Sequence, residues 1–145
     1  MVWEALLEEM PITALVRNLA TMTRVGLLDP SSAATAHVVA ELADAERIRR
    51  ARVHPIAVLA ALRTYASGRG ARGRNEWWSV RQIVDALDAA FYTAFGNVTP
   101  TDKRLLLALD VSGSMESGWV AGIPGLSPRD ASAALALVTA ATEQG

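Results

Sequence analysis

The stretch from Pro11 to Met22, PITALVRNLATM, decides what kind of fold this chain adopts. Its apolar residues recur three and four positions apart, which is the spacing of one face of an α-helix. Pro11 stands at the start of this pattern, where the first helical turn tolerates a missing N–H. We therefore predict a helix with one buried face here. That face consists of Ile12, Leu15, Val16, Leu19 and Met22.

Two further helices are predicted from their starting and ending residues. One begins near Ser32, after a helix-breaking cluster of Asp, Pro and Ser. The other begins at His54-Pro55, because a proline disfavours the helical conformation in the residue before it. Gly68 follows the apolar pattern of that helix and suits the left-handed conformation in which helices often end.

A fourth helical segment is predicted after a glycine- and arginine-rich loop at residues 67–75. Ser79 and Gln82 have the spacing of a capping box, in which the two side chains satisfy backbone amides at a helix start. Gly96 suits a left-handed exit at the other end. Residues 1–99 are therefore predicted to form an all-helical domain.

The character of the sequence changes near residue 100. Residues 104–109, RLLLAL, form a continuous apolar run, and a run that is apolar on both faces is typical of a central parallel strand. After a Ser/Gly-rich loop, Ser127, Pro128 and Asp130 provide the start of an alanine-rich helix that reaches about Thr142. Strand, loop and helix open a doubly wound sheet, so residues 100–145 are predicted to begin an α/β domain.

The clearest chemistry lies in the segment DVSGS, at the carboxyl end of the predicted strand, where open α/β sheets bind ligands. A carboxylate and two hydroxyls are hard oxygen donors that suit Mg²⁺. We predict a divalent-cation site made by Asp110, Ser112 and Ser114. The simpler alternative is an ordinary turn in which Asp110 accepts backbone hydrogen bonds.

Enzymatic activity is not expected at this loop. A phosphatase of the haloacid dehalogenase type also begins with an Asp at a strand end, but it needs a second Asp two residues later. Ser112 occupies that place. No His, Cys or Lys near the loop suggests nucleophilic catalysis either.

Charge is segregated along the chain, although the formal net charge is only -1. Up to Glu46 there are seven acidic residues and two arginines, whereas residues 47–75 contain eight arginines and no acidic residue. Such a basic block requires a polyanion or open solvent. The arginines at residues 47–52 also have a simpler interpretation, as a solvated helix face or as partners of the upstream acids.

The composition is that of a globular protein, with 145 residues of which 51% are hydrophobic. The absence of cysteine rules out a disulfide framework and fits a reducing compartment, so a cytoplasmic location is expected. No apolar run approaches the ~20 residues that cross a bilayer. The N-terminus is acidic where a secretory signal would be basic.

Three blocks in a fixed order carry a family resemblance. They are Val2 to Thr23, residues 51–73 and the segment LALDVSGSM at residues 107–115. Together they resemble the distal part of the Ro autoantigen family, whose helical module is the TROVE domain. LALDVSGSM also resembles the first half of the metal-ion-dependent adhesion site (MIDAS) of von Willebrand factor A domains. The resemblance extends from Val2 to Glu143.

The resemblance implies a fold and a function. It implies that residues 1–99 are the distal part of a HEAT-like helical repeat, and that residues 100–145 are the N-terminal fragment of a Rossmann-like von Willebrand A domain. It also implies a ribonucleoprotein that binds small structured Y RNAs on its outside and the ends of misfolded RNAs in its central hole. A small noncoding RNA is therefore the expected partner.

The arginine block agrees with an RNA partner, because arginine clamps phosphates in a fork and stacks on unpaired bases. The loop arginines are favoured because neighbouring glycines let the backbone approach a phosphate closely. His54 has the alternative role of a helix-start cap. The candidate RNA contacts are Arg47, Arg50, Arg52, His54, Arg69, Arg72 and Arg74.

Compared with the family, the chain is expected to be a partial-length member. It lacks the earlier helical repeats, and it stops after one strand and one helix of the A domain. A full adhesion-type site takes a Thr and an Asp from later loops, so the site at Asp110 is expected to be half a site that binds Mg²⁺ weakly at best. A second polypeptide that carries the missing parts is a candidate partner, and residues 104–145 are expected to dock loosely.

Two rival functions remain open at this point. The first is a metal-dependent protein-interaction module, in which Asp110, Ser112 and Ser114 present a cation to a carboxylate of the partner while the helices serve as a scaffold. The second is a truncated product that folds poorly and has no function. RNA binding by a Ro-type protein is the prediction that we favour.

Overall fold

The structure is a computed structural model that describes residues 2–70 and 75–143, and this part of the chain is helical. None of the helices described is long and apolar enough to cross a membrane. The α-helices are α1 (Val2–Leu7), α2 (Ile12–Arg24), α3 (Ala33–Ala43), α4 (Ala45–Arg50), α5 (Pro55–Ser67), α6 (Arg81–Thr93) and α7 (Pro128–Thr142). Short 3-10 helices occur at η1 (Ala94–Asn97), η2 (Gly113–Glu116) and η3 (Val120–Gly122).

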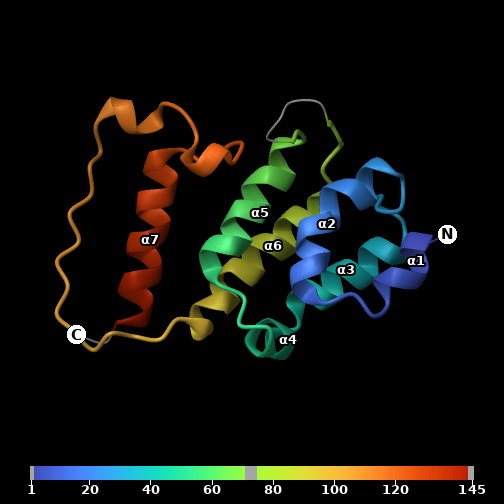
Figure 1. The fold of residues 1–145 in the computed structure, drawn as a ribbon, viewed down its shortest axis with the longest axis horizontal. Helices are drawn as coiled ribbons and strands as arrows, with labels where there is room; N and C mark the ends of the chain where they lie inside the picture. Colours follow the sequence, from blue (N-terminus) through green and yellow to red (C-terminus); the bar gives the residue numbers. More distant parts are fainter. Residues whose placement is uncertain (1, 71–74, 144–145) are drawn as a thin grey trace.

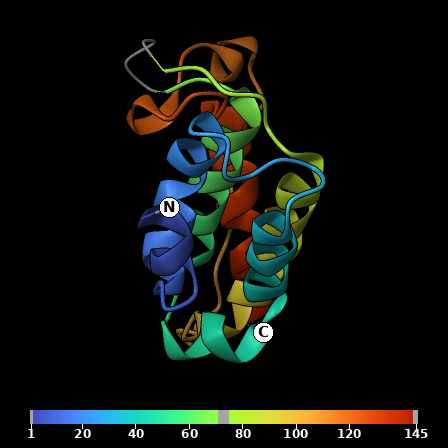
Figure 2. The ribbon, with the colours of Figure 1, turned by 90° about the vertical axis from the view of Figure 1, so that its right-hand side faces the viewer.

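Helices α5 and α6 form the centre of the molecule and run in opposite directions (Figure 1). Helix α2 packs against α5, and α3 packs against α6. Helix α7 lies on the other side of α5, and the long segment between η1 and η2 passes along the outer side of α7 (Figure 1). The view turned by 90° shows that the loop after α5 and the loop around η3 lie at the same end of the molecule (Figure 2).

Most of the predicted helix ends are confirmed, because side chains or backbone conformation satisfy them as expected. The Ser32 hydroxyl accepts a 3.1 Å hydrogen bond from an amide in the first turn of α3, and the Ser127 hydroxyl does the same for α7. The His54 Nδ1 atom accepts a 3.2 Å hydrogen bond from the amide of Ile56 at the start of α5. Gly68 ends α5 with a φ of 68°.

Two predicted ends of α6 are wrong. The helix begins at Arg81, and no side chain caps it, so Ser79 and Gln82 do not form a capping box. The Gln82 amide group instead donates a 3.1 Å hydrogen bond to the backbone oxygen of Pro30, because tertiary packing brings the two together. Gly96 continues into η1 and has no left-handed φ, so it is not a helix exit.

The predicted strand at residues 104–109 is absent from the structure, and the described part of the chain contains no ladder of paired strands. The segment is extended but exposed along its whole length, and Leu106 is 95% exposed. No backbone hydrogen bond joins this segment to another described residue, and a single unpaired strand is not stable by itself. The apolar run therefore does not form the buried strand that its pattern predicted.

One hydrophobic core includes both halves of the chain. Its centre consists of fully buried residues of α2, α3, α5 and α6, such as Leu15, Val38, Val58 and Leu87. The C-terminal part adds Leu126, Ala134 and Val138 to the same cluster. Helix α7 is therefore packed on the helical body, which differs from the loose docking that we expected for this part of the chain, whereas residues 104–119 are almost all exposed. The division into two domains near residue 100 stays a prediction.

Candidate nucleic-acid interface

Arg47 is held by contacts within the protein rather than presented to solvent. Its guanidinium lies 2.6 Å from the Glu41 carboxylate and donates a 3.0 Å hydrogen bond to the backbone oxygen of Met10. These contacts join α4 to α3 and to the turn before α2. The predicted role of Arg47 in RNA binding therefore competes with a structural role, as the upstream acidic residues suggested.

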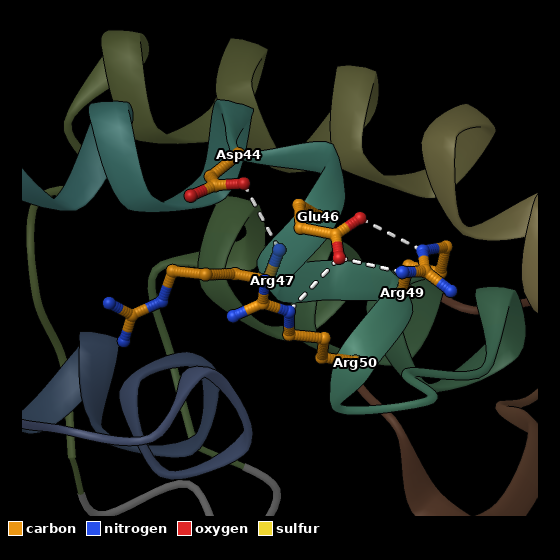
Figure 3. A network of polar contacts seen from close by, with 5 residues as sticks. All are labelled: Asp44, Glu46, Arg47, Arg49 and Arg50. Carbon is orange, nitrogen blue, oxygen red and sulfur yellow. Dashed lines mark hydrogen bonds and ion pairs between the residues drawn. The ribbon is translucent and has the colours of Figure 1, made fainter.

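Arg49 and Arg50 share one carboxylate on α4 (Figure 3). Arg49 makes two hydrogen bonds to Glu46, at 2.6 and 2.9 Å, and Arg50 makes one at 3.0 Å. The hydrogen bonds from Arg49 and then Arg50 lower the pKa of Glu46 to about 2. Because all three side chains are exposed, solvent screens these ion pairs and they add little to stability, so a phosphate group could compete for the guanidiniums.

Arg52 and His54 lie between α4 and α5. Arg52 is exposed, has a φ of 50° and takes part in no ion pair with another described residue. His54 is exposed as well, and its ring caps α5 through Nδ1 as described above. Of the predicted contacts around α4, Arg52 is therefore the one whose charge no described carboxylate balances.

Arg69 lies at the opposite end of α5, in a hairpin-like turn. The amide of Trp77 donates a 2.9 Å hydrogen bond to the Gly68 oxygen, and Gly70 donates a 2.8 Å hydrogen bond to the oxygen of Asn75. The Arg69 guanidinium lies 5.4 Å from the centre of the Trp119 ring, in a cation–π contact. Arg72 and Arg74 lie outside the described residues.

The arginine-rich stretch therefore does not form one surface. Helix α4 and the Gly68–Trp77 turn lie at opposite ends of α5 (Figure 1). Arg63, midway along α5, forms a 3.5 Å ion pair with Asp130 of α7 and so contributes to packing. Closeness in the sequence did not predict closeness in space, because a helix of 13 residues separates the two groups of arginines.

Sequence reasoning missed the side chain that organises the turn, which is Tyr65. Its ring is 2% exposed and stacks against Trp77, with 6.4 Å between the ring centres. Its hydroxyl accepts a 3.1 Å hydrogen bond from the buried amide of Val80 and lies 2.9 Å from the Thr23 hydroxyl. The Trp77 indole N–H donates a 2.9 Å hydrogen bond to the Tyr65 backbone oxygen. No sequence spacing indicates these contacts, because they join α2, α5 and the start of α6.

The structure brings together the three residues predicted to bind a cation. The hydroxyl oxygens of Ser112 and Ser114 are 3.0 Å apart, and the Asp110 carboxylate accepts a 2.8 Å hydrogen bond from the amide of Ser112. This backbone hydrogen bond is the main cause that lowers the pKa of Asp110. Three hard oxygen donors match part of the coordination sphere of Mg²⁺. The loop is exposed, and the described residues contain no cluster of three or more His, Cys, Asp or Glu side chains that could hold a metal.

The chain is similar in sequence to a known domain family and to known proteins. Residues 1–64 match the TROVE domain. Over 143 residues the chain is 48% identical to the RNA-binding protein RO60 of Deinococcus radiodurans. The alignment covers 98% of this chain and 27% of that protein. Over 139 residues the chain is 49% identical to the RNA-binding protein RO60 of Caenorhabditis elegans. This alignment covers 95% of this chain and 21% of that protein.

The fold of the chain is also similar to that of a solved structure. The crystal structure of the Deinococcus radiodurans RO (RSR) protein matches with a TM-score of 0.91 and 48% sequence identity, over 98% of this chain and 29% of that one. The chain therefore spans between a fifth and a third of the length of these relatives. The TROVE match and the likeness to RO60 proteins together support the predicted relationship of this chain to the Ro family.

Proposed function

We propose that this chain binds RNA as part of a Ro-type ribonucleoprotein, and that its ligands are small structured noncoding RNAs of the Y type or misfolded RNAs. The observation that carries the proposal is 48% identity, over 98% of this chain, to a protein named for RNA binding. The excess of arginine after residue 46 supplies the positive charge that phosphates require. No catalytic step is part of this proposal.

We place the main contact at the turn after α5 rather than at α4. Arg47, Arg49 and Arg50 have carboxylate partners within the protein. Arg69 has no carboxylate partner among the described residues, and two more arginines, Arg72 and Arg74, follow it closely in the sequence. A phosphate at this turn therefore displaces no internal ion pair of Arg69.

Two triple variants that remove the same charge from different places test this assignment. One is Arg69→Ala, Arg72→Ala and Arg74→Ala, and the matched control is Arg49→Ala, Arg50→Ala and Arg52→Ala. RNA affinity is measured by fluorescence anisotropy over a range of salt concentrations. We expect the turn variant to lose most of its affinity and its salt slope to fall by about 2, because each phosphate contact to a single strand contributes about 0.7. The control should lose much less.

The possible results separate the claims. If the wild-type chain does not bind RNA at low salt, the proposed function is wrong. If both triple variants weaken binding equally, net charge alone drives it and the turn is not the site. A larger loss in the α4 variant would move the site to the other end of α5.

A further inference from the structure

Trp78 is an aromatic side chain that the phosphate contacts leave unused. It is 94% exposed, so nearly its whole aromatic surface is accessible to a ligand. Trp77, just before it, and Val80, two residues after it, are held in place. Trp77 stacks on Tyr65, and Val80 is 3% exposed and bonded to the Tyr65 hydroxyl.

The backbone around Trp78 explains why one tryptophan is inside and its neighbour outside. From Glu76 to Trp78 the side chains are exposed, half-buried and exposed in turn, as neighbouring side chains of an extended chain are, and this alternation ends at Ser79. The hydrogen bond from Trp77 to Gly68 fixes which side is which. A Cβ atom at Gly68 would lie 2.9 Å from the Trp77 oxygen, so this close pairing needs glycine. Trp78 is therefore presented from a fixed backbone, which lowers the entropy lost when a ligand stacks on it.

The surroundings of Trp78 combine positive charge and aromatic surface. Trp78 and Arg69 line the same open hollow of about 500 Å³. Beyond Arg69 lies Trp119, which is 46% exposed. Exposed aromatic rings beside an arginine are the combination with which proteins bind single-stranded nucleic acids, since bases stack on the rings and phosphates contact the guanidinium.

We propose that Trp78 is a stacking platform for an unpaired base of RNA, with Arg69 contacting the adjoining phosphate. This inference rests on the proposed RNA-binding function. It specifies which part of the RNA the chain recognises. Glu76, which pairs with Arg69 in an isolated antiparallel bridge, also lines the hollow. Its carboxylate can accept a hydrogen bond from a base amino group, while the Arg69 guanidinium can contact the phosphate, so the hollow suits a nucleotide with an accessible base. A base in a duplex is already stacked and paired, so an unpaired base is the ligand.

The test compares two ligands of equal charge. One is a ten-nucleotide oligoadenylate RNA, and the other is an abasic RNA backbone of the same length. We expect the wild-type chain to bind the oligoadenylate more tightly. Trp78→Ala should weaken oligoadenylate binding between about fivefold and a hundredfold, in line with the loss of one stacked base, and leave abasic binding unchanged. Trp78→Phe should retain much of the affinity.

Tyr92→Ala is the control variant, because Tyr92 is 52% exposed on α6 and lies outside the hollow. It should leave both affinities unchanged. Because Trp78 is exposed, we expect the Trp78→Ala variant to unfold at the same temperature as the wild type, which would show that its fold is intact.

Several results would overturn the inference. If RNA binds but Trp78→Ala has no effect on the oligoadenylate, the platform is wrong while the RNA-binding proposal stands. If neither ligand binds the wild type at low salt, both proposals fail. If the variant keeps its RNA affinity but loses self-association in sedimentation, Trp78 belongs to a protein contact instead.

Discussion

Glu46 shows at the scale of one residue why a basic sequence does not by itself define a binding surface. A single carboxylate on α4 engages the guanidiniums of both Arg49 and Arg50 (Figure 3). The positive charge of the pair is thereby partly balanced before any ligand arrives. Arg69 differs because its described contact is an aromatic ring, which leaves its charge unbalanced.

The Glu46 carboxyl group should titrate near pH 2 rather than at its usual value of 4.5. Because folding lowers this pKa, the contribution to stability is complete above about pH 4.5 and is lost as the pH falls toward 2. The stability change itself is small, since the group is exposed. We therefore expect the shift to be visible in the NMR titration of the side-chain carboxyl carbon.

Arg49→Ala should raise the pKa of Glu46 toward 4.5, because Arg49 is the main cause of the shift. Arg17→Ala is the control. It removes an equal charge at an exposed position of α2 and should leave the pKa of Glu46 unchanged. An ordinary pKa in the wild-type chain would contradict the contacts drawn in Figure 3.

At the scale of elements, the Tyr65 side chain joins α2, α5 and the chain leading into α6. Its hydroxyl bonds to the buried amide of Val80 and to Thr23, while its ring supports Trp77. The extended segment that presents Trp78 is therefore held by a contact in the core. Removing this contact should loosen the turn as well as destabilise the protein.

Tyr65→Phe should lower the free energy of unfolding by ~1–3 kcal/mol, because it leaves the Val80 amide buried without an acceptor. Urea denaturation followed by circular dichroism would measure the change. Tyr92→Phe removes the same hydroxyl from a half-exposed ring and should cost little. Equal stability in the two variants would mean that the buried hydrogen bond contributes nothing.

At the scale of the whole molecule, the described part of the chain is one helical body with one exposed apolar segment. Residues 104–111 make no backbone hydrogen bond to another described residue. Their exposed apolar side chains are Leu105, Leu106, Leu107, Leu109 and Val111. Beside them, the Glu143 carboxylate accepts hydrogen bonds from the amides of Thr101 and Asp102, which ties the start of the segment to the end of α7.

We expect the amides of residues 104–111 to exchange with solvent deuterium nearly as fast as in an unfolded peptide. The amides of α5 and α6 should be protected, since these helices form the centre of the core. Helix α7 is the internal control, because it belongs to the same C-terminal part but is packed. Strong protection of Leu105 to Leu109 in the monomeric chain would show that the segment is paired, and would contradict this prediction.

The sequence by itself determined the five longer α-helices and several of their ends, but not the short helices α1 and α4. Ser32, His54-Pro55, Gly68 and Ser127 act within a turn or two of their own positions, and local hydrogen bonds decide them. The contacts among Asp110, Ser112 and Ser114 are local in the same way, while the cation site itself stays a prediction. Such features can be predicted because all the interacting atoms lie within a few residues.

Only the tertiary structure decided which arginines lie together and which tryptophan faces solvent. Arg47 meets Glu41 and Met10 through helix packing, and α5 separates the other arginines into two groups. The RLLLAL segment shows the same limit, because a strand needs a neighbour that no local pattern supplies. Contacts between residues far apart in the sequence depend on how the helices pack, and packing is a property of the whole chain.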